Sequence, residues 1–290
     1  MATQATPPIV TRFYRNLDFA LDVIANRQVT FVHVDTLNGP FDPYFVLETD
    51  FAENHSELIR YLQESHPGDD IWFNQLMPAE NWQGAINGIR DHMAYVRNTT
   101  FVFSASSELE GASPKDSLYM WGHYADGHRG VAFEFDTRVL ASSVMRHSKN
   151  STGEITDPWV RMEYRPSVPP LTAQIYYQFL KQGYAFATGV QTVRVRTALE
   201  DYYDLMPRVK SEAWHTENEW RLMWRNDETR MKFCRFPISQ DAIRTIILGL
   251  KMPPKAKDDF IAEARHNFPD ATVLHARKRR GDFALMFERA

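Results

Sequence analysis

The sequence has one cysteine, Cys234, and no long apolar run. A single cysteine cannot form an internal disulfide or a multi-cysteine metal site, which excludes disulfide-stapled, zinc-ribbon and iron–sulfur proteins and fits a reducing compartment. No window approaches the length of about 18 apolar residues that a membrane-spanning helix needs, and residues 1–8 lack a basic region followed by an apolar one. We therefore expect a cytoplasmic protein with no membrane partner.

Several signatures of common enzyme classes are also missing. There is no Gly-rich loop ending in Lys-Ser/Thr, no G-x-G-x-x-G, no H-E-x-x-H and no G-x-S-x-G. The ten histidines are scattered, with no pair at helical spacing beside a carboxylate, so we expect no bound metal. The net charge of −4 gives no general attraction to nucleic acid. The basic run Arg277–Arg280 is most simply a solvated hairpin tip, and a nucleic-acid contact there is the alternative.

The composition is that of a folded globular protein. Hydrophobic residues make up 43% of the 290 residues, charged residues 24% and aromatic residues 13%, which supplies a substantial core and excludes disorder. Neither a repeat nor a convincing linker divides the chain. We predict a single α+β domain over residues 1–290, in which a mixed, split sheet is surrounded by helices.

Hydrophobic periodicity predicts elements along the whole chain. It opens with a strand, a helix from Leu17 with Asn16 as N-cap, and a second strand. Ser113, Pro114 and Asp116 predict a short helix that carries the aromatic residues as far as Tyr124. The other predicted elements are helices at 53–64, 79–97, 171–206 and 254–267, strands at 100–103, 131–136, 159–165 and 243–248, a hairpin at 220–233, and strands around 272 and 284.

Three dense segments resemble a known family. They are Phe13-Tyr-Arg15, Leu118–Ala125 and Trp214–Arg221. Together with Gly39–Pro43, Gly130–Asp136 and Ile246–Gly249, they are similar to a bacterial and phage family of unknown function, whose members carry Met-Trp-x-His-Tyr-Ala and a later Glu-x-Glu-Trp-Arg. One departure is the turn at 38–42, where Asn-Gly-Pro-Phe-Asp stands for the family's more frequent Phe-Asn-Asp-Pro-Phe-Asp.

A second resemblance concerns mechanism. The order Arg15, Ser104-Ala-Ser106 and Glu217-Asn-Glu219 is similar to the Arg … Ser-x-Ser … Glu-x-Glu pattern of ADP-ribosyltransferases. That resemblance implies a split sheet with NAD, as substrate, in its cleft. It further implies transfer of ADP-ribose to an unidentified macromolecule, or hydrolysis of NAD, in toxin or phage-defence settings.

The residue chemistry agrees with such a reaction. Breaking the nicotinamide–ribose bond builds positive charge on the sugar, which a fixed carboxylate stabilises. We assign Glu219 as the catalytic carboxylate and Glu217 as its assistant, projecting from one face of an extended strand. The remaining assignments are Arg15 as phosphate clamp, Ser104 and His123 as ribose contacts, and Trp121 or Tyr124 as a stacking wall.

Other interpretations fit the same residues. Glu219 and Arg221 can form an ion pair on a half-buried strand face, and the aromatic helix can serve packing alone. The cleft can bind a nucleotide or a protein segment without chemistry. A third function is a Mg²⁺-dependent nuclease or phosphotransferase that uses Glu134, Glu217 and Glu219. A large distance between Glu134 and the other two carboxylates would disfavour that function.

Overall fold

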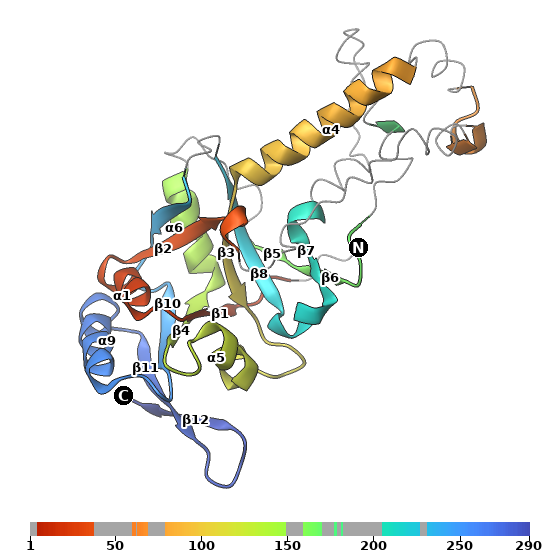
Figure 1. Cartoon of the computed structure of the whole chain (residues 1–290). Coiled ribbons are helices and arrows are strands. Elements are labelled where there is room, and N and C mark those ends of the chain that lie inside the picture. The colour runs from red at the N-terminus through yellow and green to blue at the C-terminus, as the bar shows by residue number, and fades with distance from the viewer. Residues whose placement is uncertain are drawn as a thin grey trace. The chain divides into compact units, whose positions relative to one another are not determined.

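The computed structural model divides the chain into two compact units (Figure 1). The first comprises Met1–Thr36, Thr99–Met162 and Glu212–Ala290, and the second comprises Leu37–Asn98 and Glu163–Ser211. The predicted turn at 39–43, most of the predicted helix at 53–64 and nearly all of the predicted helix at 171–206 lie outside the described residues. The described residues are 5–37, 60–61, 63–68, 79–148, 159–169, 177–178, 181, 205–226 and 231–290.

The described part of the first unit is built on a ten-stranded mixed sheet, as expected for an α+β protein. Eight strands follow the order β12-β11-β10-β4-β1-β3-β2-β9, and β8 pairs with β3 and β5. The pair β10–β11 is parallel and the other pairs are antiparallel. The strands are β1 (Ile9–Tyr14), β2 (Gln28–His33), β3 (Thr100–Ser106), β4 (Val131–Asp136), β5 (Val160–Arg161), β8 (Glu219–Arg225), β9 (Phe233–Pro237), β10 (Ile243–Leu248), β11 (Thr272–Lys278) and β12 (Leu285–Arg289).

The strand–helix–strand opening predicted from the sequence is confirmed. Helix α1 (Leu17–Ala25) begins after Asn16, whose side-chain oxygen accepts a hydrogen bond from Phe19 N at 2.9 Å. Asn26 ends the helix, and β2 follows two residues later. The capping asparagine satisfies one of the orphan amides of the first turn, which is why the helix starts there.

Strand β3 is the branch point of the sheet. Along one edge it pairs with β8 over its whole length, from Thr100↔Arg225 to Ser106↔Glu219. Its other edge is shared, because β2 pairs at Phe101 and Val102 whereas β1 pairs only at Ser106. The sheet therefore divides at β3 into a β1 branch and a β2 branch.

The predicted hairpin at 220–233 is wrong. Strands β8 and β9 do exist on either side of 226–229, but they do not pair with each other. β9 instead pairs with β2, with Phe31 opposite Cys234, while β8 is enclosed between β3 and β5. Local turn residues predicted a hairpin, whereas long-range pairing of apolar strands decided the partners.

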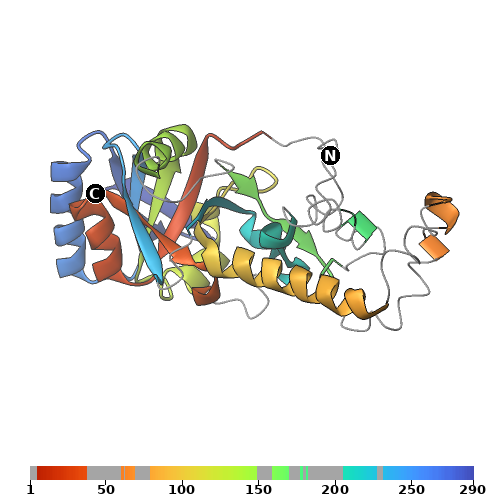
Figure 2. The same cartoon turned by 90° about the horizontal axis from the view of Figure 1, so that it is seen from above.

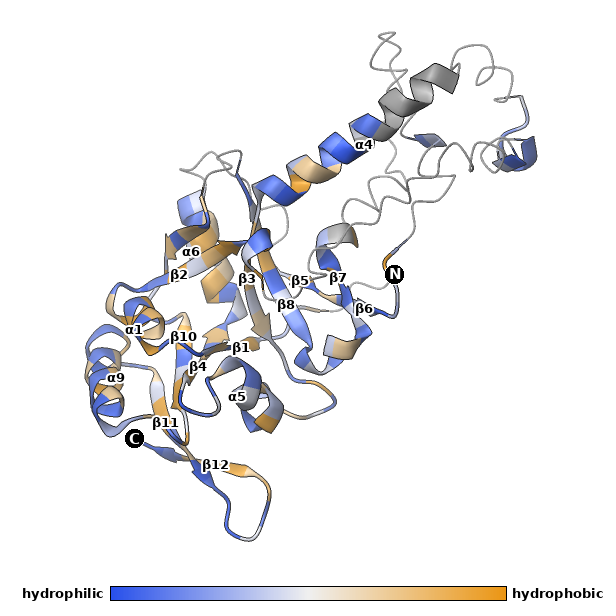
Figure 3. Cartoon of the chain, viewed as in Figure 1, coloured by the Kyte–Doolittle hydropathy of each residue, from blue (hydrophilic) through white to orange (hydrophobic). Residues whose placement is uncertain are grey.

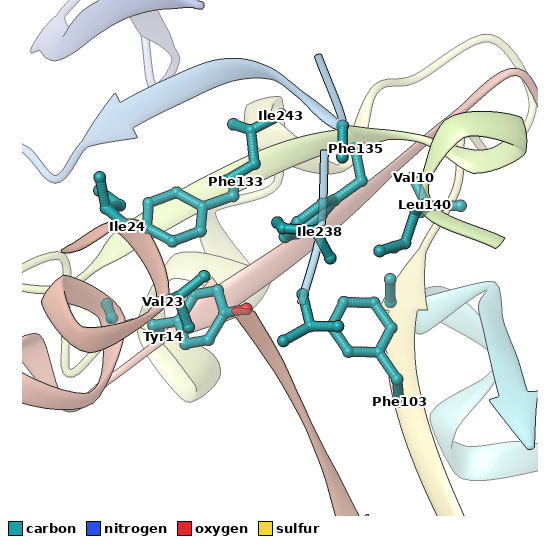
Figure 4. Close-up of a cluster of buried hydrophobic side chains, with 14 of the residues drawn as sticks. Val10, Tyr14, Val23, Ile24, Phe103, Phe133, Phe135, Leu140, Ile238 and Ile243 are labelled. Atoms are coloured by element: carbon teal, nitrogen blue, oxygen red, sulfur yellow. The ribbon is translucent and has the colours of Figure 1, made fainter. Parts of the chain in front are cut away.

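The main core lies on the sheet face that three helices cover (Figure 2). These helices are α1, α6 (Thr137–Ser148) and α9 (Pro254–Asn267), and α1 packs against α9. Figure 4 shows how Tyr14, Phe133 and Phe135 from the strands pack in this core with Leu140 from α6. Figure 3 shows β4 and β10 as largely hydrophobic, whereas α9 carries hydrophilic residues along much of its surface.

The opposite face of the sheet is covered in part by α5 (Leu118–Tyr124). Trp121 of α5 is fully buried and meets Phe13 of β1 edge-to-face, with ring centroids 5.2 Å apart. The sequence predicted one helix capped by Ser113. Instead a 3₁₀ turn, Pro114–Asp116, precedes α5, and the capping side chain is Ser117, which accepts from Met120 N at 3.2 Å.

The described part of the second unit is smaller. Helix α4 (Ala79–Thr99) matches the helix predicted at 79–97, and β6 (Glu163–Arg165) pairs in parallel with β7 (Val209–Ser211). Although α4 is the longest of the described helices, none of them is long and apolar enough to cross a bilayer.

Candidate functional site

Four buried polar residues form one row across the α5 face of the sheet. The strand registers place Glu134 of β4 opposite Thr11 of β1, Thr11 opposite Ser106 of β3, and Ser106 opposite Glu219 of β8. Residues directly opposite in antiparallel strands project to the same face. All four are at least nine-tenths buried. This polar row (Glu134, Thr11, Ser106, Glu219) contrasts with the apolar core on the other face.

Glu219 ends the row in a buried ion pair. Arg221 donates from Nε to Glu219 Oε1 at 2.6 Å, and the side chains are 1% and 6% exposed. The two residues are two positions apart on β8, so they share a face, as the sequence alternation predicted. A charge-assisted bond in this setting fixes the orientation of the carboxylate.

Glu217 does not lie on the strand, which corrects the sequence prediction. It ends the 3₁₀ helix Glu212–Glu217, and β8 begins only at Glu219. Asn218 between them has φ 41°, a left-handed conformation that asparagine tolerates better than most residues. The backbone therefore turns between the two glutamates, which ends the strand alternation that would place both on one face.

Asn218 is held from three sides. Its Nδ2 donates to Ser107 Oγ at 2.8 Å and to the carbonyl of Glu108 at 2.7 Å. Its Oδ1 accepts from Arg161 Nη2 at 3.0 Å, and its carbonyl accepts from Ser107 N at 3.1 Å. These bonds fix the turn that separates Glu217 from Glu219.

Tyr124, at the end of α5, donates its phenolic hydroxyl to Glu217 Oε1. Burial raises the pKa of Tyr124 well above its usual range, and the hydrogen bond with Glu217 and the negative charges of Glu217 and Glu219 act in the same direction. The phenol therefore stays protonated and keeps one oxygen of Glu217 occupied as an acceptor. The set Glu217, Glu219, Arg221 and Tyr124 is called the carboxylate cluster below.

Arg15 reaches the other side of α5. Its Nη2 donates to the carbonyl of His123 at 2.6 Å, and both residues are exposed. The His123 ring lies 4.4 Å from that of Tyr119 and 6.5 Å from that of Tyr124, measured between centroids. The structure thus brings Arg15 and His123 together, next to Tyr124 of the carboxylate cluster.

Ser104 lies beneath the cluster. It is opposite Arg221 in the β3–β8 register, so both project to the same face. Its hydroxyl oxygen is buried and has no hydrogen-bond partner among the described residues. Of the predicted site residues, it is the one with a buried side-chain oxygen or nitrogen that has no hydrogen-bond partner among the described residues.

Trp121 is placed differently from the sequence assignment. It is fully buried, and its indole Nε1 donates to the carbonyl of Lys115 at 2.7 Å. No ring face is exposed for stacking with a ligand. Its packing against Phe13 instead anchors α5 to β1, and so positions the neighbouring His123 and Tyr124.

Glu134 stands apart from the other carboxylates. Three strand steps separate it from Glu219 in the polar row, or about 14 Å at the usual spacing of paired strands. Lys115 Nζ contacts its Oε1 at 2.9 Å. Among the described residues, no group of three His, Cys, Asp or Glu side chains is arranged to hold a metal ion. Both observations disfavour a three-carboxylate Mg²⁺ site.

Two glycines in the motif segments are explained by backbone packing. A Cβ on Gly130 would lie 2.1 Å from the carbonyl oxygen of Tyr14, and one on Gly249 would lie 2.4 Å from that of His128. Gly249 N donates to the carbonyl of Gly130 at 3.0 Å. Asp136, in the same motif, accepts from Arg138 N and Val139 N at the start of α6. These motif residues shape the fold and do not reach the carboxylate cluster.

Sequence reasoning missed Lys115 and Asn218. The ammonium of Lys115 pairs with Glu134, a contact that no local pattern predicts. Asn218 supplies the turn between the two glutamates. An asparagine inside a predicted alternating strand is a signal for a left-handed break that could have been used.

Comparison with known proteins gives one match. The model of a family described as "Protein of unknown function (DUF2971)" matches residues 120–222, a stretch that begins in α5 and ends in β8. No curated protein and no solved structure matches the chain. The resemblance to a family of unknown function is thereby confirmed for this stretch, which contains Tyr124, Glu217, Glu219 and Arg221. Residues 120–222 therefore match the model of a family of unknown function.

Proposed function

We propose that the protein is an ADP-ribosyltransferase-like enzyme that binds NAD and either transfers ADP-ribose to a macromolecule or hydrolyses NAD. The observation that carries the proposal is a continuous series of contacts. Arg15 contacts His123, the ring of His123 lies beside that of Tyr124, and Tyr124 contacts Glu217. Residues 15, 104, 123, 124, 217 and 219, which the sequence pattern singled out, thus lie around one end of α5 and the adjoining strands.

Glu219 has one property that stabilisation of a cationic sugar requires, which is a carboxylate held in a fixed orientation. As the nicotinamide–ribose bond breaks, its electron pair leaves with nicotinamide and positive charge develops on the ribose. A carboxylate already oriented by Arg221 at 2.6 Å needs little reorganisation to stabilise that charge. We assign Glu219 this role and Arg221 the role of a positioning residue.

Glu217 is assigned to the acceptor. The nucleophilic oxygen or nitrogen of the acceptor forms a bond to the ribose carbon, and its proton must go to a nearby base. Glu217 keeps one oxygen hydrogen-bonded to Tyr124, which orients the carboxylate toward that task. With water as acceptor the same step gives hydrolysis.

The remaining residues are assigned to binding. Arg15 is exposed, and its Nε and Nη1 make no hydrogen bond within the described part of the chain, so they are available for a pyrophosphate. The unsatisfied hydroxyl of Ser104 and the exposed ring of His123 are assigned to the ribose. Trp121 is assigned a structural role, in which its contact with Phe13 anchors α5 to β1.

The proposal is tested by incubating the protein with NAD and measuring the released nicotinamide by chromatography. We expect Glu219→Gln to lower turnover by roughly 10²–10³-fold, as for loss of other preorganised electrostatic groups. Tyr124→Phe removes only the hydroxyl that orients Glu217 and should lower turnover by about tenfold. Because Glu219→Gln also disturbs a buried ion pair, the thermal unfolding of each variant must be measured alongside.

Glu134→Gln is the matched control. It neutralises another buried carboxylate on the same sheet face, which also has a cationic partner, but it lies outside the carboxylate cluster. Turnover should therefore be unchanged. If the wild type releases no nicotinamide, or if Glu134→Gln and Glu219→Gln lower turnover equally, the catalytic proposal is wrong.

A non-catalytic binding module is the second candidate. It is favoured by the burial of Glu219 and Arg221, since a fully buried ion pair can serve a structural role alone. A thermal-shift experiment with NAD separates the candidates, because a binder is stabilised by a ligand that stays intact, whereas an enzyme consumes it.

A further inference from the structure

A second polar site lies on the opposite face of the sheet from the carboxylate cluster. A hollow of about 220 Å³ is formed by the first two turns of α9 together with β10, β11 and β12. His275 and Arg277 of β11 line it with Lys257 of α9. His275 is opposite Leu248 of β10, whose side chain belongs to the main core, so the hollow is on the α9 side.

His275 contributes an unsatisfied buried nitrogen to this hollow. The residue is 7% exposed, and its Nε2 has no hydrogen-bond partner among the described residues. Burial lowers the pKa of His275, and the positive charges of Lys257 and Arg277 lower it further, against smaller opposing effects of Glu288 and the main chain of Gly249. A buried donor or acceptor without a partner costs free energy unless a ligand or water satisfies it.

Positive side chains outnumber negative side chains around the hollow. Lys257, Arg277 and Arg289 line it together with Asp258 and Glu288. Burial, and then the charge of Arg277, lower the pKa of Lys257 as well. Lys257 is half-buried and Arg277 is exposed, and an anion between them would relieve the repulsion between the two cations.

The start of α9 adds the positive end of its helix dipole. The helix has fourteen residues, and its N-cap, Pro253, makes no side-chain capping bond. The dipole of a helix attracts negative charge to its first turn. Arg277 Nε donates a hydrogen bond to Glu288 Oε2 at 3.2 Å. The two terminal nitrogens of Arg277 have no hydrogen-bond partner among the described residues.

We propose that this hollow binds a phosphoryl group, held by Lys257, Arg277 and His275 at the positive end of α9. The site is independent of the proposed NAD chemistry, because it lies on the other face of the sheet and shares no residue with the carboxylate cluster. A phosphoryl group offers several acceptor oxygens and a negative charge, which matches the donors of a lysine, an arginine and a protonated imidazole.

The first experiment uses inorganic phosphate and observes the ring protons of His275 by NMR. Phosphate should shift these signals and raise the pKa of His275, because the added negative charge stabilises the imidazolium. Lys257→Met should weaken phosphate binding by about tenfold or more, the usual effect of losing one charge-assisted hydrogen bond. Lys255→Met is the matched control, since Lys255 is exposed in the same turn of α9 and does not line the hollow.

Two outcomes would overturn the proposal. One is a pKa of His275 that phosphate leaves unchanged, and the other is an equal loss of phosphate binding in Lys257→Met and Lys255→Met. His275→Gln provides a second variant if Lys257→Met does not fold, and it should also weaken phosphate binding relative to Lys255→Met.

The source of the phosphoryl group is distinguished by three phosphorylated ligands and one control. The ligands are inorganic phosphate, adenosine monophosphate and a short single-stranded oligonucleotide with a 5′-phosphate, and the control is the same oligonucleotide without it. Tighter binding of the phosphorylated oligonucleotide alone would identify a nucleic-acid end, with the neighbouring basic run Arg277–Arg280 as its further contact. Equal binding of all phosphorylated ligands would identify the phosphoryl group itself. Equal binding of the oligonucleotide without its 5′-phosphate would contradict phosphoryl recognition.

Discussion

The two ends of the polar row hold the same residue type in different electrostatic surroundings. Glu219 and Glu134 are both buried glutamates on one sheet face, and both contact a cation, Glu219 at 2.6 Å and Glu134 at 2.9 Å. The difference lies in the cation. Arg221 is 1% exposed, whereas the Lys115 side chain is 29% exposed and keeps part of its contact with water.

The exposure of the cation decides how firmly each ion pair is held. A buried arginine cannot be hydrated if its carboxylate is lost. The contributions of Glu219 and Arg221 to stability are therefore strongly interdependent. A half-solvated lysine can rotate into water, and its pair with Glu134 is correspondingly weaker. The β8 end of the row is therefore the one whose geometry is fixed in advance, which is what an electrostatic role in catalysis requires.

The largest expected effect is that of Arg221→Met. Removing the guanidinium leaves the buried Glu219 carboxylate without it, and the free energy of unfolding should fall by about 3–5 kcal/mol. Urea unfolding measures the change. Arg225→Met is the control, because Arg225 lies on the same face of β8 but is only half-buried. Equal losses in the two variants would contradict the assigned strength of the buried pair.

The second prediction concerns removal of both partners. The double variant Glu219→Leu/Arg221→Met leaves neither charge unpaired, and it should recover about 2 kcal/mol or more of the stability that Arg221→Met loses. The same urea unfolding measures this recovery, provided that the slope against urea is unchanged. A double variant less stable than Arg221→Met would show that the two side chains act independently.

The third prediction applies the same change at the other end of the row. Lys115→Met should lower the free energy of unfolding by only about 1 kcal/mol, since solvent already screens the lysine and the glutamate can be partly rehydrated. Comparison of Lys115→Met with Arg221→Met tests directly whether exposure of the cation sets the strength of each pair. A loss as large as that of Arg221→Met would refute this explanation.

Much of the fold followed from local sequence patterns. The opening strand, helix and strand, β4, β10 and α9 were predicted because each carries its own periodicity and boundary residues, such as Asn16 and Pro254. The pairing of β9 with β2 was not predicted. It joins residues about 200 positions apart in sequence, and no local signal reports such a contact.

The candidate site was predicted less completely than the fold. Strand alternation correctly placed Glu219 and Arg221 on one face, because the period of two holds along β8. It failed at Glu217, where the left-handed Asn218 ends the alternation. For the aromatic helix the sequence leaves stacking on a ligand and packing as alternatives, and the burial of Trp121 shows packing. Spacing within a seven-residue helix does not tell which aromatic residue meets the sheet.

The smallest expected effect is a dependence on pH at the Lys115 end of the row. His128 stacks on Trp121 with centroids 6.2 Å apart, and Trp121 holds the carbonyl of Lys115. Burial, and then the charge of Lys251, lower the pKa of His128. The unfolded chain therefore binds a proton more readily than the folded one, and stability should decrease as the pH falls below the unfolded value of about 6.5.

Thermal unfolding between pH 7.5 and pH 5.5 measures this decrease. His128→Gln should reduce the decrease but not abolish it, because the pKa of His275 is also lowered by burial and by the charges of Lys257 and Arg277. The variant His128→Gln/His275→Gln should reduce it further. His123→Gln, at an exposed position on the same side of the sheet, should follow the wild type. A pH dependence that His128→Gln leaves unchanged would mean that proton binding at His128 is not coupled to folding at this end of the row.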